Sequence, residues 1–264
     1  MLEQIILGVA QGIFEWLPVS SEGLLILIKR NFFGSAQNLE VLIQEILFLH
    51  LGTFLAVLVY FRRDVIALFK TFFDYQSAQE QDKRILVFLV ITTLVSGLIG
   101  FGLLKALEEL EETLLYSTKM LTGFIGLCLL ITGVLQIKAP QGGYKKEKEL
   151  KNKDGFLLGL MQGLAALPGL SRSGLTVSGL LLRKFNEGVA LKLSFLMSLP
   201  IVLGGNIVFN LKYLSFSKEL AVALFFSFIF GILTIDLLLR LAKKMRFGWF
   251  VFIFGILIII SIFV

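Results

Sequence analysis

Two apolar segments of this chain repeat the same pattern, and polar residues break both of them in the middle. The matched residues are 7–12 with 158–163, Pro18 with Pro168, and 20–24 with 171–175. Polar breaks are costly in an apolar helix, so a break that recurs needs a structural or functional reason. The internal repeat predicts two related halves, at about 1–140 and 150–264, within a single domain that spans 1–264.

Hydropathy predicts where this repeat folds. The sequence is 56% hydrophobic and contains 26 phenylalanines, and its mean hydropathy of +0.87 is too high for a soluble domain with a polar shell. Several apolar runs approach the ~20 residues that cross a bilayer. We therefore predict an all-α polytopic membrane protein. The expected spans are 46–61, 85–104, 120–137, 190–210, 219–239 and 247–264, with a short interfacial helix within 65–84.

The distribution of charge predicts the topology. If the broken segments 3–28 and 155–182 each return to the side they entered, each half has three spans and the two halves are inverted. Eighteen of the 25 Lys and Arg residues then lie opposite the termini, and six lie on the side of the termini. This bias places the basic side in the cytoplasm and both termini outside. The prediction is an inverted-topology repeat in the cell membrane, with about six transmembrane helices and two re-entrant helical hairpins that meet near the midplane.

The net charge and the cysteine content indicate which partners to expect. A net charge of +6 could suit a nucleic acid, but basic loops of a membrane protein explain it, and we expect no nucleic-acid partner. Cys128 is the only cysteine and lies in an apolar run, so no disulfide or cysteine metal site is expected. A homodimer is a further possibility that the sequence leaves open.

The second break has the chemistry of an anion site. Arg172 is a permanent cation whose fork of donors suits phosphate or carboxylate. Backbone N–H groups at a helix start add further donors. The predicted substrate-binding residues beside it are Ser171, Ser173, Thr176, Gly169 and Gly174. Phosphate fits this set better than a neutral sugar, and a surface loop with one solvated arginine is the alternative.

The first break would bring a carboxylate to that anion. Glu15 is a candidate base or metal ligand, and Gln11 lies one helical turn earlier on the same face. Ser20 and Ser21 are either nucleophiles or caps of the returning helix, and Ser20 is also a predicted substrate-binding residue. The alternative for Glu15 and Arg172 is a buried ion pair that only holds the hairpins together.

His50 is the only histidine of the chain and lies within the first predicted span. A histidine that is satisfied by its own helix is the favoured interpretation. An auxiliary role in catalysis is the alternative.

Both motifs resemble those of the undecaprenyl-diphosphate phosphatase family, also called the bacitracin-resistance family. The stretch Gln11-Gly-Ile-Phe-Glu15-Trp-Leu-Pro-Val-Ser20-Ser21-Glu-Gly is similar to the family's (E/Q)GxxE(F/W)LPxSSxGH, and Pro168-Gly-Leu-Ser171-Arg172-Ser173-Gly-Leu-Thr176 is similar to PGxSRSGxT. The resemblance implies a membrane hydrolase that removes the terminal phosphate of undecaprenyl diphosphate and so regenerates the lipid carrier for cell-wall synthesis. It also implies a site that opens to the outer face.

The resemblance further implies roles for individual residues. Glu15 would be the general base or, with Gln11, a ligand of a divalent cation, Mg²⁺ or Ca²⁺. Ser21 would be the nucleophile candidate. Arg172, with Ser171, Ser173 and Thr176, would hold the diphosphate.

The chain departs from the family motif at Leu24, where the family has histidine. Leucine cannot transfer a proton, so a mechanism that requires that histidine fails here. Three outcomes remain open: Ser21, or water activated by Glu15, performs the chemistry; His50 substitutes; or the protein is a lipid-phosphate transporter, flippase or non-catalytic binder. We favour the first.

Overall fold

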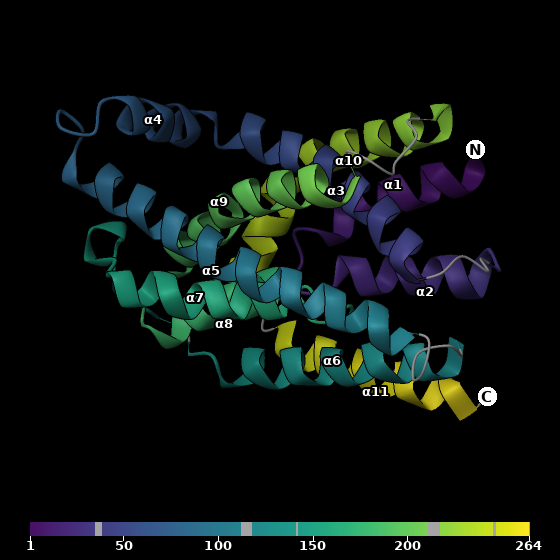
Figure 1. Ribbon diagram of the computed structural model, residues 1–264. Helices are drawn as coiled ribbons and strands as arrows, with labels where there is room; N and C mark the ends of the chain where they lie inside the picture. Colours follow the sequence, from purple (N-terminus) through teal and green to yellow (C-terminus); the bar gives the residue numbers. More distant parts are fainter. Residues whose placement is uncertain (35–38, 112–117, 141, 211–216, 245–246, 264) are drawn as a thin grey trace.

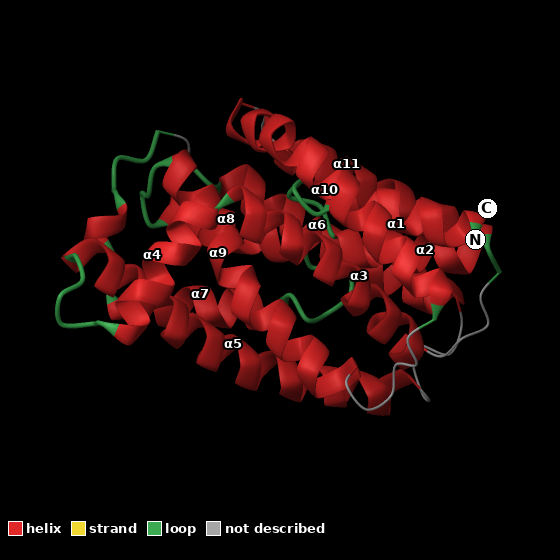
Figure 2. Cartoon of the chain, turned by 90° about the horizontal axis from the view of Figure 1, so that it is seen from above, coloured by secondary structure: helices red, strands yellow, loops and turns green. Residues whose placement is uncertain are grey.

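The part of the chain that the structure describes folds mainly into helices, which loops connect (Figures 1 and 2). The structure is a computed structural model, and it describes all residues except 35–38, 112–117, 141, 211–216, 245–246 and 264. Within these limits it contains eleven α-helices, five of which are long and apolar enough to cross a membrane. These five are α3 (Leu39–Tyr60), α5 (Glu80–Glu111), α6 (Thr118–Lys138), α9 (Glu187–Gly205) and α10 (Lys218–Lys244). The prediction of an all-α polytopic membrane protein is confirmed.

The sixth predicted span, 247–264, is the shorter helix α11 (Phe247–Ile260), followed by a 3₁₀ turn at Ser261–Phe263. The first span begins earlier than the predicted residue 46, because α3 starts at Leu39. The polar residues in its first turns are tolerated there. Glu45 forms an ion pair with Lys29, whose side chain also lies 3.7 Å from Glu3.

Each of the two broken segments forms a pair of short helices. The first pair is α1 (Leu2–Phe14) and α2 (Ser21–Phe32), and the second is α7 (Asn152–Leu164) and α8 (Arg172–Leu182). A proline lies in each break, and a serine caps the helix that follows. Ser20 accepts a hydrogen bond from Gly23 N at 3.1 Å, and Ser171 accepts one from Gly174 N at 3.0 Å.

Each pair packs on a long helix from the other half of the sequence. Helix α1 lies along α10 and α7 lies along α5 (Figure 1). Glycines permit the close approach of these helices. A Cβ at Gly8 would lie 2.3 Å from Ala223 O of α10, and one at Gly159 would lie 2.7 Å from Val95 Cβ of α5. Gly8 and Gly159 occupy matched positions of the repeat, so the two halves use similar packing.

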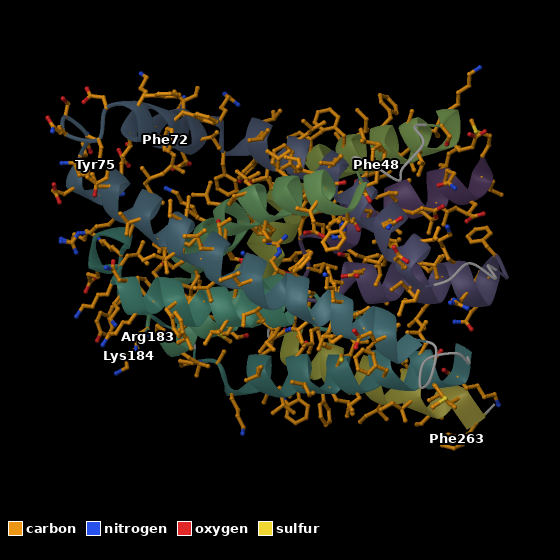
Figure 3. All side chains as sticks on the ribbon, in the orientation of Figure 1. Phe48, Phe72, Tyr75, Arg183, Lys184 and Phe263 are labelled. Atoms are coloured by element: carbon orange, nitrogen blue, oxygen red, sulfur yellow. The ribbon has the colours of Figure 1, made fainter. Side chains whose placement is uncertain are left out.

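The two ends of the molecule differ in character. Both termini lie at one end, from which α1 runs inward, while α7 runs inward from the opposite end (Figure 1). Arg183 and Lys184 lie at that opposite end, as does Phe72 of α4 (Arg62–Phe73) (Figure 3). Helix α4 falls partly within the predicted interfacial segment and exposes Ile66, Phe69, Phe72 and Phe73.

Candidate active site

The tips of the two helix pairs meet in the interior of the molecule. Gly169 N donates to Ser20 Oγ at 3.2 Å, and Ser171 Oγ donates to Val19 O at 3.0 Å. Ser173 Oγ donates to Leu17 O at 3.1 Å. Serine side chains therefore connect the two breaks, which lie about 150 residues apart in the sequence.

Helix α6 supports this junction with two polar side chains that the sequence did not single out. Gln136 Nε2 donates to Pro18 O at 2.6 Å, and Thr132 Oγ1 accepts from Ser171 N at 3.2 Å. Both bonds satisfy backbone groups that the broken helices leave without helical partners. These hydrogen bonds thus stabilise the non-helical backbone of the two breaks.

Glu15 lies at the centre of the junction, directly after the last residue of α1, and is 7% exposed. Its Oε1 accepts from Arg172 Nη2. Its Oε2 accepts from Ser21 Oγ at 2.8 Å and from Gln11 Nε2 at 3.1 Å, and lies 3.3 Å from His50 Nε2. The structure therefore brings together Gln11, Glu15, Ser21, His50 and Arg172. These donors hold the buried carboxylate in one orientation.

Trp16 fixes the position of Glu15 from the neighbouring residue. Its side chain is 1% exposed, and Nε1 donates to Gly231 O of α10 at 3.1 Å. Its ring also packs edge-on against Phe195 of α9, with a centroid distance of 5.3 Å.

Arg172 is the first residue of α8 and is fixed by groups from α9. Nη1 donates to Ser194 O at 3.1 Å, and the guanidinium lies 5.8 Å from the centre of the Phe195 ring. Thr176 braces the same contact, since its Oγ1 lies 2.7 Å from Ser194 Oγ. Sequence reasoning missed Ser194, for which the only signal is a hydroxyl within an apolar span.

His50 contacts the site through one nitrogen and its own helix through the other. Nδ1 lies 2.8 Å from Ile46 O, as expected for a histidine that its helix satisfies, whereas Nε2 faces Glu15. The structure thus shows the contact with its own helix that the sequence favoured, and it also places His50 beside Glu15.

Two adjoining cavities reach this cluster. A small polar pocket of about 40 Å³ is lined by polar side chains from both helix pairs and α3. These are Glu15, Ser20, Ser21, Glu22, His50, Arg172 and Ser173. A larger, mainly apolar cavity of about 530 Å³ shares Glu22, His50 and Arg172 with it. Its volume is typical of ligand-binding cavities.

Several predicted site residues do not line either cavity. Among the described residues, Gln11, Ser171 and Thr176 line neither cavity. Gly169 and Gly174 also line neither; a Cβ at Gly169, where φ is +98°, would lie 2.7 Å from Ile125 O. Leu24, at the position of the family histidine, packs against the apolar core beside Leu25 and Ile26.

The predicted divalent cation has no set of protein ligands within the described residues. No group of three or more His, Cys, Asp or Glu side chains there is placed to hold a metal ion. Both oxygens of Glu15 already accept hydrogen bonds. The residues present therefore do not fit a cation held by the protein alone.

Comparison with known proteins identifies relatives along almost the whole chain. The model of the family described as bacitracin resistance protein BacA matches residues 4–259. The chain is 40% identical to an undecaprenyl-diphosphatase of Methanococcoides burtonii, over 99% of this chain and 98% of that relative. It is 36% identical to one of Methanothrix thermoacetophila over 97% and 94% of the two chains. It is 33% identical to undecaprenyl-diphosphatase 1 of Shouchella clausii over 100% and 96%.

Proposed function

Because the chain belongs to the bacitracin resistance protein BacA family, we propose that it is an undecaprenyl-diphosphatase whose active site is the polar pocket between the two helix pairs. Such an enzyme is a hydrolase that converts the lipid diphosphate to the monophosphate and inorganic phosphate. One observation carries the assignment of the site. Glu15 from the first break contacts both Arg172 from the second break and the hydroxyl of Ser21.

We place the diphosphate on Arg172. Its guanidinium lines the pocket and is permanently charged, so it can bind the distal phosphate and stabilise the charge that develops on it. Ser20, Ser21 and Ser173 surround the same space with hydroxyl groups. Ser171, Thr176, Gly169 and Gly174 contribute by holding the loop in position.

Ser21 is the nucleophile in this proposal, and Glu15 is its base. A nucleophile with a base in hydrogen-bond reach is the arrangement that covalent catalysis requires, and the Ser21–Glu15 contact is 2.8 Å. The Ser21 proton passes to Glu15 while Oγ attacks the distal phosphorus. The bond from that phosphorus to the bridging oxygen breaks, and its electron pair leaves with the lipid monophosphate.

The apolar cavity would receive the first part of the polyprenyl chain. It adjoins the polar pocket and is lined by apolar and small residues of α5 and α9, including Gly97, Phe101, Leu104 and Ile201. An apolar chain placed there leaves water only at the phosphate end.

We propose that the site opens to the outer face of the cell membrane, in the orientation that the helix pairs and the basic residues support. We propose an inverted repeat with α11 as the sixth transmembrane helix and the two helix pairs as re-entrant hairpins. The hairpins enter from opposite ends and meet tip to tip, and the basic residues Arg183 and Lys184 lie opposite the termini. The positive-inside rule then places both termini outside.

Phosphate release from a C55 diphosphate by the purified protein in detergent tests the function. Release that Arg172→Ala abolishes is the expected result, and repeating the assay with chelator tests the divalent cation. No release by folded protein with any divalent cation would contradict the proposal. In that case, lipid-phosphate translocation in liposomes that Glu15→Gln leaves unchanged would favour a transporter.

A further inference from the structure

Glu22 is the acidic residue of the pocket that the mechanism above leaves without a task. It lies in the first turn of α2, beside Ser21, and lines both the polar pocket and the apolar cavity. Glu22 therefore stands where the phosphate end of the substrate would meet its apolar tail.

The two carboxylates of the pocket have different surroundings. Both Glu15 oxygens accept hydrogen bonds from side chains. Within the described residues, no hydrogen bond or ion pair engages the Glu22 carboxylate. The charged side chains that share its pocket are Glu15 at the end of α1, His50 on α3 and Arg172 on α8. Protein donors therefore leave the acceptor sites of Glu22 available to water in the pocket, whereas they already use part of those of Glu15.

The serine route offers a task for a second base. In the route that we consider, the proton that moved from Ser21 to Glu15 stays there and returns to Ser21 Oγ when the phosphoserine is cleaved. A different group then deprotonates the attacking water. We propose that Glu22 is this general base, and the inference rests on the proposed function.

With Glu22 as the base, every proton and bond in the hydrolysis of the phosphoserine is accounted for. Water attacks the phosphorus of phosphorylated Ser21 and gives a proton to the Glu22 carboxylate. The bond from phosphorus to Ser21 Oγ breaks, and Oγ recovers its proton from Glu15. Inorganic phosphate leaves, and Glu22 later releases the proton to water. This assignment also removes any need for a histidine at position 24, where Leu24 packs into the core.

The test uses C55 diphosphate labelled with ³²P at the distal phosphorus and the full-length protein in detergent. Glu22→Gln should slow phosphate release by roughly 100- to 10,000-fold, as for loss of a general base, and should leave label on the protein. The variant Glu22→Asp should release phosphate faster than Glu22→Gln. Glu80→Gln is the matched control, since Glu80 is exposed and lies on α5 away from the pocket.

Two results would overturn the inference while wild-type turnover keeps the proposed function intact. One is phosphate release by Glu22→Gln within a few-fold of the wild type. The other is slow release without label on the protein, in a variant that elutes as the folded wild type does. The double variant Ser21→Ala/Glu22→Gln should carry no label, and label on it would place the phosphoryl group elsewhere.

Discussion

Ser20 and Ser21 are adjacent in the sequence, but the structure gives them different tasks that two alanine variants can separate. Ser20 Oγ accepts from Gly23 N and from Gly169 N, so it caps α2 and joins the two breaks. Loss of an N-cap costs about 1 kcal/mol, and an orphaned buried N–H costs about 1–3 kcal/mol more. Ser20→Ala should therefore destabilise the protein by roughly 2–4 kcal/mol.

Ser21→Ala removes a single hydrogen bond, the one donated to Glu15. That carboxylate keeps its contacts with Arg172, Gln11 and His50, so the loss of stability should stay near 1 kcal/mol. Turnover, however, should fall at least 1,000-fold if Ser21 is the nucleophile.

Thermal unfolding in detergent and phosphate release measured on the same preparations distinguish the two serines. The expected pattern is a large drop in the unfolding midpoint for Ser20→Ala with residual turnover in the folded fraction, and the reverse for Ser21→Ala. Near-wild-type turnover by Ser21→Ala would exclude a phosphoserine intermediate. An unchanged midpoint for Ser20→Ala would refute the assignment of Ser20 as the connection between the breaks.

Three further predictions test the rest of the account. Arg172→Lys keeps the charge but cannot reach both Glu15 and the Ser194 carbonyl, so phosphate release should slow by about 100-fold or more; a smaller effect would mean that charge alone suffices. Gly159→Val should lower the unfolding midpoint by the equivalent of about 1–3 kcal/mol, whereas Gly102→Val, where no neighbouring atom lies within 4 Å of the added Cβ, should not. Gly97→Phe fills the apolar cavity and should raise KM for a C55 diphosphate but not for a short isoprenyl diphosphate; equal changes would place the lipid chain elsewhere.

The sequence predicted the architecture best where the physics is local. Long apolar runs identify membrane helices, and prolines with capping serines identify the breaks, so α1, α2, α7 and α8 follow from their residues. The repeat also predicted that Glu15 and Arg172 would face each other, which the structure places in contact. Helix ends were less accurate, because the ion pair of Lys29 with Glu45 lets α3 begin within a polar stretch.

The remaining site residues depend on which long helices pack against the breaks, and sequence spacing does not reveal this. Ser194 and Gln136 reach the junction from α9 and α6, which are distant in the sequence. His50 was expected to be satisfied by its own helix, and its second contact comes from the packing of α3 beside α1. A polar side chain in an apolar span is costly, and this cost was the sequence signal that His50 has a partner outside its own helix.

The central claim is that two residues from opposite halves of the chain form one catalytic unit. A double-mutant cycle on phosphate release from a C55 diphosphate tests this claim with Glu15→Gln and Arg172→Lys. If each variant alone slows turnover by about 100-fold, the double variant should be slowed by no more than about 1,000-fold, because residues that act as a unit are strongly non-additive. A loss of about 10,000-fold, the product of the single effects, would mean that Glu15 and Arg172 act independently and would contradict the account.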